Sequence, residues 1–244
     1  MPWSPAGPRA WDSGESGDGR LGNWAIWRFG NLATGQYGSG FFLVARSPSR
    51  PIAGFSAMRI TAGEHRGRQL RSPRGSRTRP TSDLLRQAIF NVVGPRVARA
   101  RVLDLFAGTG ALGLEALSRG AADATFVECD RPALTSLRAN LVGLGLSTRA
   151  RIVARDALAA LDGLARAGER FDCVFLDPPY IGDFARRCVE TLAPGEILSE
   201  NAVLLVQAFH KTDLPERTGT LSRAWQRRYG ETRLTLYRKE GACP

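Results

Sequence analysis

Hydrophobic and polar positions follow a regular pattern from about residue 58 onward, where short apolar runs alternate with segments of helical periodicity. The apolar runs predict strands over 101–106, 124–129, 150–155, 171–177 and 202–209, and the periodic segments predict helices over 111–119, 131–143, 157–167 and 183–193. This alternation is typical of an α/β domain with a mostly parallel sheet and helices on both of its faces. Such sheets bind ligands at the carboxyl ends of their strands.

Further elements flank this alternating core. Apolar side chains at helical spacing predict a helix over 84–93, after the capping residues 80–83 and before Gly94-Pro95. Two pairs of short strands complete the prediction, 59–62 with 67–70 and 224–229 with 232–238. The second pair turns at Gly230 and should add an antiparallel hairpin to the sheet, while the first should form a small N-terminal β-hairpin.

The pattern divides the chain into three parts. Residues 1–57 are rich in glycine, proline and tryptophan and lack sustained periodicity. Such a segment buries too little apolar surface to offset its ordering entropy, so we expect a disordered extension or an upstream stretch included by a misplaced start codon. Residues 58–82 should form the small hairpin and a basic segment, and 83–244 the α/β domain.

Charge adds a candidate partner to this picture. The formal net charge is +11, which favours a polyanion, although an arginine-rich solvated surface would give the same excess. Seven arginines stand against one acid, Glu64, between residues 59 and 79. We expect this segment to contact nucleic-acid phosphates through Arg59, Arg66, Arg68, Arg71, Arg74 and Arg77.

Cysteine usage and hydropathy exclude several classes of protein. The four cysteines, Cys129, Cys173, Cys188 and Cys243, form no CxxC pair and lie far apart. This spacing argues against a zinc site and a disulfide framework, and it fits a reducing cytoplasm. No apolar run approaches the roughly 18 residues that a membrane-spanning helix needs. We therefore expect a cytoplasmic protein without a metal.

A glycine-rich loop follows the first strand of the α/β domain. Gly108, Gly110 and Gly113 satisfy the GxGxxG spacing between a predicted strand and a predicted helix, and Glu128 ends the next strand. Glycines in this context allow a tight turn and a close backbone approach, while an acid at this distance can bind ribose hydroxyls. The loop therefore predicts a site for a nucleoside cofactor.

Asp104 favours S-adenosylmethionine (SAM) over NAD as that cofactor. It lies on the strand just before the loop, where it could attract the ammonium group of SAM but would repel the pyrophosphate of NAD. Asp156, at the end of the third strand, could accept a hydrogen bond from an adenine amine. It could equally cap the helix that follows, and the sequence leaves both interpretations open.

The fourth strand ends in the tetrapeptide Asp177-Pro178-Pro179-Tyr180. The prolines fix the backbone and remove two N–H donors, which leaves a rigid corner with a carboxylate, backbone carbonyls and an aromatic ring. An exocyclic base amine is a poor nucleophile, and acceptors that hold its hydrogens would direct its lone pair toward a methyl donor. Tyr180 could stack on a base taken out of its helix. After a SAM-type loop, this corner predicts methylation of a base amine.

Together these features resemble class I SAM-dependent methyltransferases, and closely the RsmD-type 16S rRNA guanine-N2 methyltransferases. The resemblance covers about residues 58–240 and rests on five sequence segments: Met58 to Gly63 with Arg66 to Arg68, Arg79 to Thr81, Arg86 to Asn91, Asp104 to Gly113, and Glu115 to Ala121, followed by the tetrapeptide. It departs from the family at two positions, where Gln87 and Gln207 stand in place of expected glutamates.

The resemblance implies a Rossmann-like fold and methyl transfer to the N2 amine of a guanine in the 16S rRNA of the small subunit. It places SAM at Asp104, Gly108, Gly110 and Glu128, with Asp156 at its adenine and with Arg79 and Thr81 near its methionine end. The target base would be held by the tetrapeptide 177–180. We expect a monomer that acts on rRNA, within a small-subunit particle.

Other functions stay open at this stage. The same tetrapeptide also serves DNA adenine-N6 and cytosine-N4 methylation, and a binding protein could retain the fold without turnover. An NAD-dependent oxidoreductase is a more remote alternative. The intact glycine loop and Asp177 favour an enzyme.

Overall fold

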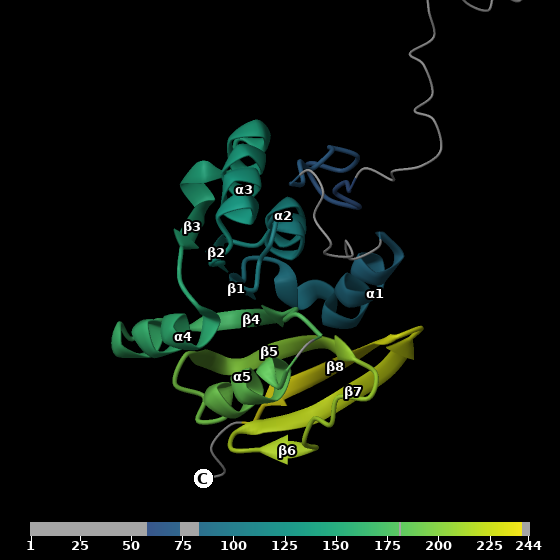
Figure 1. Cartoon of the computed structure of the whole chain (residues 1–244), viewed down its shortest axis with the longest axis vertical. Helices are drawn as coiled ribbons and strands as arrows, with labels where there is room; N and C mark the ends of the chain where they lie inside the picture. The colour runs from purple at the N-terminus through teal and green to yellow at the C-terminus, as the bar shows by residue number, and fades with distance from the viewer. Residues whose placement is uncertain (1–57, 74–82, 181, 241–244) are drawn as a thin grey trace, which may run out of the picture. The chain divides into compact units, whose positions relative to one another are not determined.

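The computed structural model describes residues 58–73, 83–180 and 182–240, which belong to the unit Ile52–Pro244 (Figure 1). The expected N-terminal extension, residues 1–57, lies outside the described residues.

Eight strands form one mixed sheet in the order β3-β2-β1-β4-β5-β8-β7-β6. Their bounds are β1 Arg101–Leu105, β2 Asp123–Val127, β3 Ala150–Val153, β4 Phe171–Leu176, β5 Leu198–Phe209, β6 Arg217–Thr218, β7 Leu221–Tyr229 and β8 Thr232–Lys239. The first five strands pair in parallel, and β8, β7 and β6 extend the sheet in antiparallel pairs. This topology confirms the predicted Rossmann-like fold with its C-terminal antiparallel hairpin.

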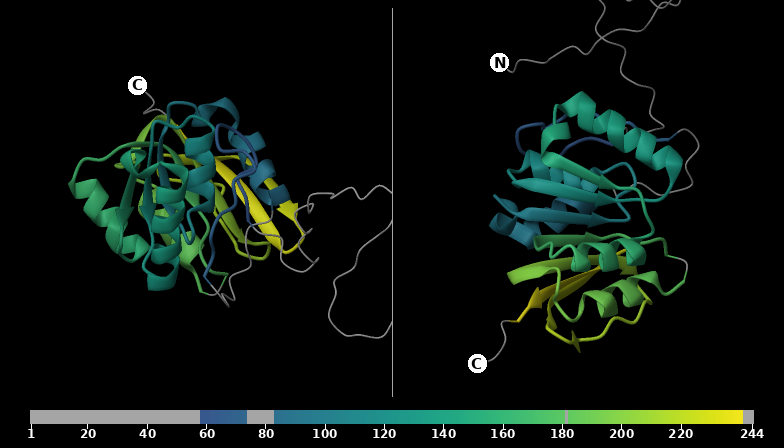
Figure 2. Two further views of the ribbon diagram at one scale, coloured as in Figure 1. Left: turned by 90° about the horizontal axis from the view of Figure 1, so that it is seen from above. Right: turned by 90° about the vertical axis from the view of Figure 1, so that its left-hand side faces the viewer.

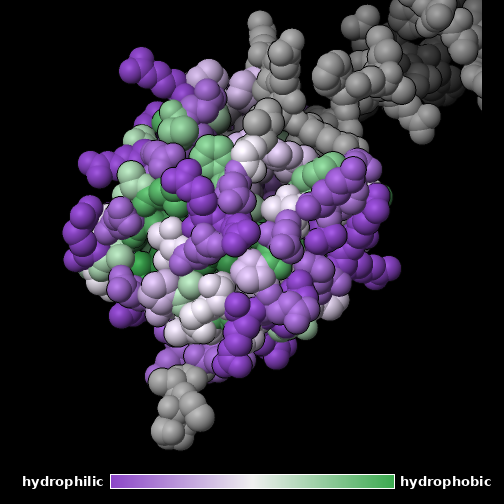
Figure 3. All heavy atoms as spheres, turned by 60° about the horizontal axis from the view of Figure 1, so that its bottom comes forward, coloured by the Kyte–Doolittle hydropathy of each residue, from purple (hydrophilic) through white to green (hydrophobic). Residues whose placement is uncertain are grey.

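Five α-helices cover the two faces of the sheet (Figures 1 and 2). They are α1 Asp83–Val93, α2 Ala111–Ser118, α3 Arg131–Leu144, α4 Ala157–Arg166 and α5 Phe184–Leu192. Helices α1, α2 and α3 contribute to the hydrophobic cluster on one face, and α4 and α5 to the cluster on the other. The view from the β6 end shows mostly hydrophilic residues with hydrophobic ones interspersed (Figure 3).

Local signals explain why α3 begins and ends where it does. The Asp130 carboxylate accepts a hydrogen bond from the Ala133 amide at 2.9 Å, and Pro132 occupies the first turn. Gly145 ends the helix with φ +70°, a left-handed conformation that favours glycine. Buried Leu134, Leu137, Leu141 and Leu144 form its apolar face. The prediction of this helix is confirmed.

The structure differs from the sequence prediction mainly in β5 and at the N-terminus. Strand β5 begins at Leu198, four residues before the predicted start. The prediction missed these residues because the exposed polar residues Glu200 and Asn201 interrupt the apolar pattern. Asn201 has φ +61°, and the β4–β5 register shifts there. The predicted N-terminal hairpin is reduced to one antiparallel bridge, Arg59 with Gln69, supported by backbone hydrogen bonds on either side of it.

Candidate active site

The glycine loop connects β1 to α2 and leaves its backbone open on one side. Gly110 caps α2 with φ +85°, a left-handed conformation that favours glycine, and a Cβ there would lie 2.4 Å from Leu137 Cδ1, so a larger residue would be strained and would displace that side chain. Gly108, at φ +56°, has no atom within 4 Å of the place that a Cβ would occupy. A ligand can therefore approach the backbone closely at Gly108.

Glu128 lies where β2 ends and faces the same loop. Its Oε2 accepts a hydrogen bond from the Gly108 amide at 2.7 Å, and its Oε1 accepts from the amides of Cys129 and Asp130. These bonds fix the carboxylate beside the open side of the loop. Each carboxylate oxygen has two lone pairs, so Oε2 can also accept a ribose hydroxyl.

Asp104 lies beneath the loop and is almost fully buried. Its Oδ2 accepts a hydrogen bond from the Gly113 amide at 2.8 Å. Burial is the main reason that the pKa of this carboxyl is raised to about 7; the Gly113 amide lowers that pKa, and the neighbouring carboxylates of Asp177 and Glu128 raise it. A cationic group near Asp104 would favour its ionised form, as the ammonium of SAM would.

Asp156 caps α4, as one of its two interpretations predicts. Its Oδ1 accepts from the amides of Leu158 at 3.0 Å and Ala159 at 3.3 Å. Both hydrogen bonds use one carboxylate oxygen, so the cap is compatible with a second role for the other. The contact with adenine stays a prediction.

The four residues of the tetrapeptide form a corner beside the glycine loop. The Asp177 amide donates to the Leu105 carbonyl at 3.4 Å, which joins the corner to the end of β1. Asp177 also lies close enough to Asp104 to raise the pKa of that carboxyl. Pro178 is buried and Pro179 exposed, whereas the Tyr180 side chain lies on the surface. The structure thus brings the predicted cofactor and base sites together.

Two residues that the sequence analysis did not assign hold the ring of Tyr180. The Tyr180 hydroxyl lies 2.6 Å from Thr232 Oγ1 at the start of β8, and the buried Gln207 Nε2 donates to it at 3.4 Å. The Phe209 ring lies 6.2 Å from the Tyr180 ring. The C-terminal hairpin therefore positions the residue that is expected to stack on the base.

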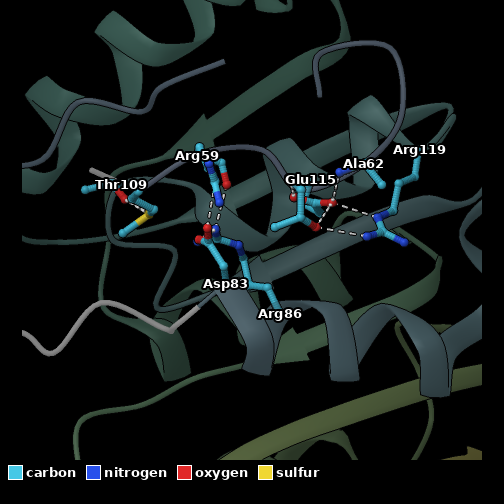
Figure 4. Close-up of polar contacts among 9 residues, drawn as sticks. Arg59, Ala62, Asp83, Arg86, Thr109, Glu115 and Arg119 are labelled. Atoms are coloured by element: carbon cyan, nitrogen blue, oxygen red, sulfur yellow. Dashed lines mark hydrogen bonds and ion pairs between the residues drawn. The ribbon is translucent and has the colours of Figure 1, made fainter. Parts of the chain in front are cut away.

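The N-terminal segment docks on α2 through a buried acid that the sequence analysis did not assign (Figure 4). Glu115 is fully buried, and its carboxylate accepts hydrogen bonds from the amides of Thr61 and Ala62 at 2.7 and 2.9 Å. It also accepts from the Thr61 hydroxyl at 2.7 Å and from Arg119 Nε at 2.8 Å. A lone acid within the otherwise apolar α2 is the sequence signal that could have identified this contact.

Asn140 joins the same segment to the glycine loop. Its Nδ2 donates to the carbonyls of Arg71 and Thr109, each at 3.0 Å, and its Oδ1 accepts from the Arg71 amide at 2.7 Å. Thr109 Oγ1 also lies 3.6 Å from Met58 Sδ. The described part of the N-terminal segment therefore packs beside the cofactor loop.

The arginines expected to bind RNA differ in whether their guanidinium groups already have a partner within the protein. All four described ones are exposed, but Arg59 pairs with Asp83 at 2.9 Å and Arg68 donates to the Gly143 carbonyl at 2.7 Å. Within the described ranges, the guanidinium groups of Arg66 and Arg71 have no such partner. The other predicted residues of this segment, Arg74, Arg77, Arg79 and Thr81, lie outside the described residues.

The described residues contain neither a metal-type cluster nor a membrane-spanning helix. No cluster of three or more histidine, cysteine, aspartate or glutamate side chains lies close enough together to bind a metal ion. None of the described helices is both long and apolar enough to cross a membrane.

Proteins similar to this chain in sequence and fold include methyltransferases. A family model described as conserved hypothetical protein 95 matches residues 58–238. The ribosomal RNA small subunit methyltransferase D of Escherichia coli is 36% identical over 188 residues, which cover 77% of this chain and 93% of that protein. The structure resembles that of the Escherichia coli protein yhhF with a TM-score of 0.67 and 37% identity, over 75% of this chain and 97% of that one.

A similar structure also contains the expected cofactor. The Thermus thermophilus 16S rRNA N2 G1207 methyltransferase (RsmC), in complex with AdoMet and guanosine, matches with a TM-score of 0.55 and 27% identity, over 68% of this chain and 45% of that one. The open backbone at Gly108 and the acids Asp104 and Glu128 fit such a cofactor. The chain belongs to the conserved hypothetical protein 95 family, that of the RsmD-type SAM-dependent rRNA methyltransferases.

Proposed function

We propose that the protein transfers the methyl group of SAM to the exocyclic N2 amine of a guanine in the 16S rRNA of the small ribosomal subunit. The observation that carries this proposal is the junction of β1 and β4, where the Asp177 amide contacts the Leu105 carbonyl. It joins the base-holding corner to the strand that leads into the cofactor loop.

Each part of this edge has its own task in the proposed reaction. Glu128 and the Gly108 backbone would hold the nucleoside part of the cofactor, and Asp104 would attract its cationic end. When bound, SAM supplies a methyl group on a positively charged sulfur. Asp177 and the Pro178 carbonyl would accept hydrogen bonds from the target amine and orient its lone pair, and the Asp177 carboxylate or solvent would take the proton that the nitrogen loses on methylation. Tyr180 would stack on the base.

Transfer of tritiated methyl groups tests the proposal. Purified protein is incubated with labelled SAM and, in parallel, with naked 16S rRNA, isolated small subunits or DNA, and the products are digested to nucleosides. The expected product is N2-methylguanosine from rRNA or from the particle. Label in adenine or cytosine, or label in DNA alone, would contradict it.

The finer partner predictions belong to the same proposal. We propose that the substrate is rRNA within a small-subunit particle, that the enzyme acts in the cytoplasm and that it is a monomer. Comparison of the naked RNA with the particle tests the first, and light scattering of the purified protein tests the last.

We predict that a chain beginning at Met58 is as stable and active as the full chain. The buried core of the described residues begins at Ile60, and residues 1–57 lack the pattern of a core. Thermal unfolding and rRNA methylation of both chains check this. A clear drop in either for the shorter chain would show that the extension contributes to the fold or the site.

Replacement of Arg66 and Arg71 by alanine is expected to weaken RNA binding without changing SAM affinity. Their exposed guanidinium groups are available for phosphates, and each lost phosphate contact should lower the salt slope of RNA binding by about one. Filter binding at several salt concentrations measures this slope. The control variant replaces two exposed arginines near the amino end of β4, Arg166 and Arg170. Equal effects in both variants would show that RNA binding depends on the overall positive charge and not on the arginines of the N-terminal segment.

A further inference from the structure

A buried amide beside the proposed base site has one end without a partner. Gln207 is only 5% exposed, and its Nε2 donates to the Tyr180 hydroxyl at 3.4 Å. Its Oε1 is buried and accepts no hydrogen bond from any residue in the described part of the chain. A buried unsatisfied acceptor is costly, so its persistence at a site calls for a ligand that donates to it.

The sheet register sets Gln207 beside Asp177, the residue proposed to hold the target amine. Val206 pairs with Leu176, so Gln207 and Asp177 each follow a paired residue on neighbouring strands. Phe175 and Leu205, two residues earlier on each strand, belong to one hydrophobic cluster. Side chains alternate between the faces of a sheet, so Gln207 and Asp177 lie on the same face.

The hydrogen bond with Tyr180 determines which end of the Gln207 side-chain amide is left for the base. The Tyr180 hydroxyl accepts from Gln207 Nε2 and can donate to Thr232 Oγ1, 2.6 Å away. This chain of hydrogen bonds uses the nitrogen of the amide. The oxygen is left as an acceptor beside the corner that is expected to hold the base.

An acceptor at this place distinguishes among bases. In guanine the ring nitrogen next to the N2 amine carries a hydrogen, whereas the ring nitrogens next to the amines of adenine and cytosine carry lone pairs. We propose that Gln207 Oε1 accepts a hydrogen bond from the N1–H of the target guanine and thereby selects guanine. Adenine or cytosine would place a lone pair against this oxygen and leave it unsatisfied.

This proposal rests on the proposed function, and the first measurement separates the two. If the wild-type protein forms no N2-methylguanosine in rRNA, the proposed function fails before any variant is compared. If it does, two variants test the residue: Gln207→Leu removes both polar ends of the amide, and Gln207→Glu retains an acceptor.

Gln207→Leu is expected to lower kcat/KM for rRNA about 10- to 100-fold, and Gln207→Glu to stay within about 5-fold of wild type. SAM affinity and the melting temperature show that each variant is folded. The matched control is Gln226→Leu, whose exposed amide donates to Thr235 Oγ1 on β8 at 3.0 Å and should not affect transfer.

Inhibition by free nucleosides tests base selection directly, because a purely structural role of Gln207 would not change the ratio of inhibition between two nucleosides. 2-Aminopurine carries the same amine as guanine, but its N1 has no hydrogen. Guanosine should inhibit wild type at least about 10-fold better than 2-aminopurine ribonucleoside, and Gln207→Leu should reduce this ratio to within about 2-fold.

Three results would overturn the proposal. One is a Gln207→Leu variant with wild-type kcat/KM, and another is an unchanged nucleoside ratio in that variant. The third is a Gln207→Glu variant as impaired as Gln207→Leu, because it would show that the site needs the N–H of the amide rather than its oxygen.

Discussion

Replacement of Asp177 by alanine is expected to lower methyl transfer at least about 100-fold and to leave SAM binding intact. The side chain sits at the corner that joins β4 to the end of β1, and its proposed task is to hold the target amine. Its loss removes an acceptor that the reacting nitrogen needs. Single-turnover transfer to rRNA and calorimetric titration with SAM measure the two quantities separately.

The control for this variant is Asp162→Ala, which removes an exposed carboxylate from α4. It should transfer methyl groups at the wild-type rate. Asp177→Asn retains one acceptor oxygen and should fall between wild type and the alanine variant. Near-normal turnover of Asp177→Ala would exclude the side chain from the reaction and leave the backbone carbonyls of the corner as the holders of the amine.

The largest expected effect on stability comes from Glu115→Ala. The substitution leaves the amides of the partly buried Thr61 and Ala62 without their acceptor and removes the partner of Arg119 (Figure 4). Loss of one member of a buried, hydrogen-bonded ion pair costs about 3–5 kcal/mol of unfolding free energy. Urea unfolding measures the loss, and trypsin should cleave sooner after the arginines between 59 and 71.

Glu190→Ala is the matched control. Glu190 also pairs with an arginine four residues away, Arg186 at 2.8 Å, but both side chains are about half exposed. Such a surface pair contributes about 0.3–0.5 kcal/mol. Equal losses of unfolding free energy in the two variants would mean that Glu115 stabilises the protein no more than a surface ion pair on a helix does. The N-terminal segment would then be held by other contacts.

The fold could be predicted from sequence where the signals are local. Strand–helix alternation predicted the parallel strands, and it predicted α3 to within one residue of its observed end. The two-residue strand β6 and the early start of β5 could not be predicted, because their pairing is decided by strands that are distant in sequence. Polar residues such as Glu200 are tolerated in β5 because they are exposed.

The site was predictable only in part, for a related reason. The glycine loop and the tetrapeptide are continuous segments, so their residue types and order carry the information. The contacts of Gln207 with Tyr180 and of Glu115 with Thr61 join positions far apart in the chain. In both cases the sequence shows a polar residue within an apolar run. Such a residue indicates that the side chain has a buried hydrogen-bond partner, but the sequence does not identify that partner. The dual possibility for Asp156 shows the same limit: the sequence suggested a cap and a ligand contact, and the structure establishes the cap.

The position of β1 between β2 and β4 has a consequence for the order of folding. Its pairing with β2 closes a loop that contains one helix, whereas its pairing with β4 must wait for β2, β3 and the helices between them. Contacts between distant segments form slowly because loop closure costs entropy. On a chain still being synthesised, the half that binds the cofactor can therefore acquire structure while the corner for the base is incomplete. The last strands, β7 and β8, then add the hairpin that holds Tyr180, so competence for methyl transfer arrives with the final residues of the sheet.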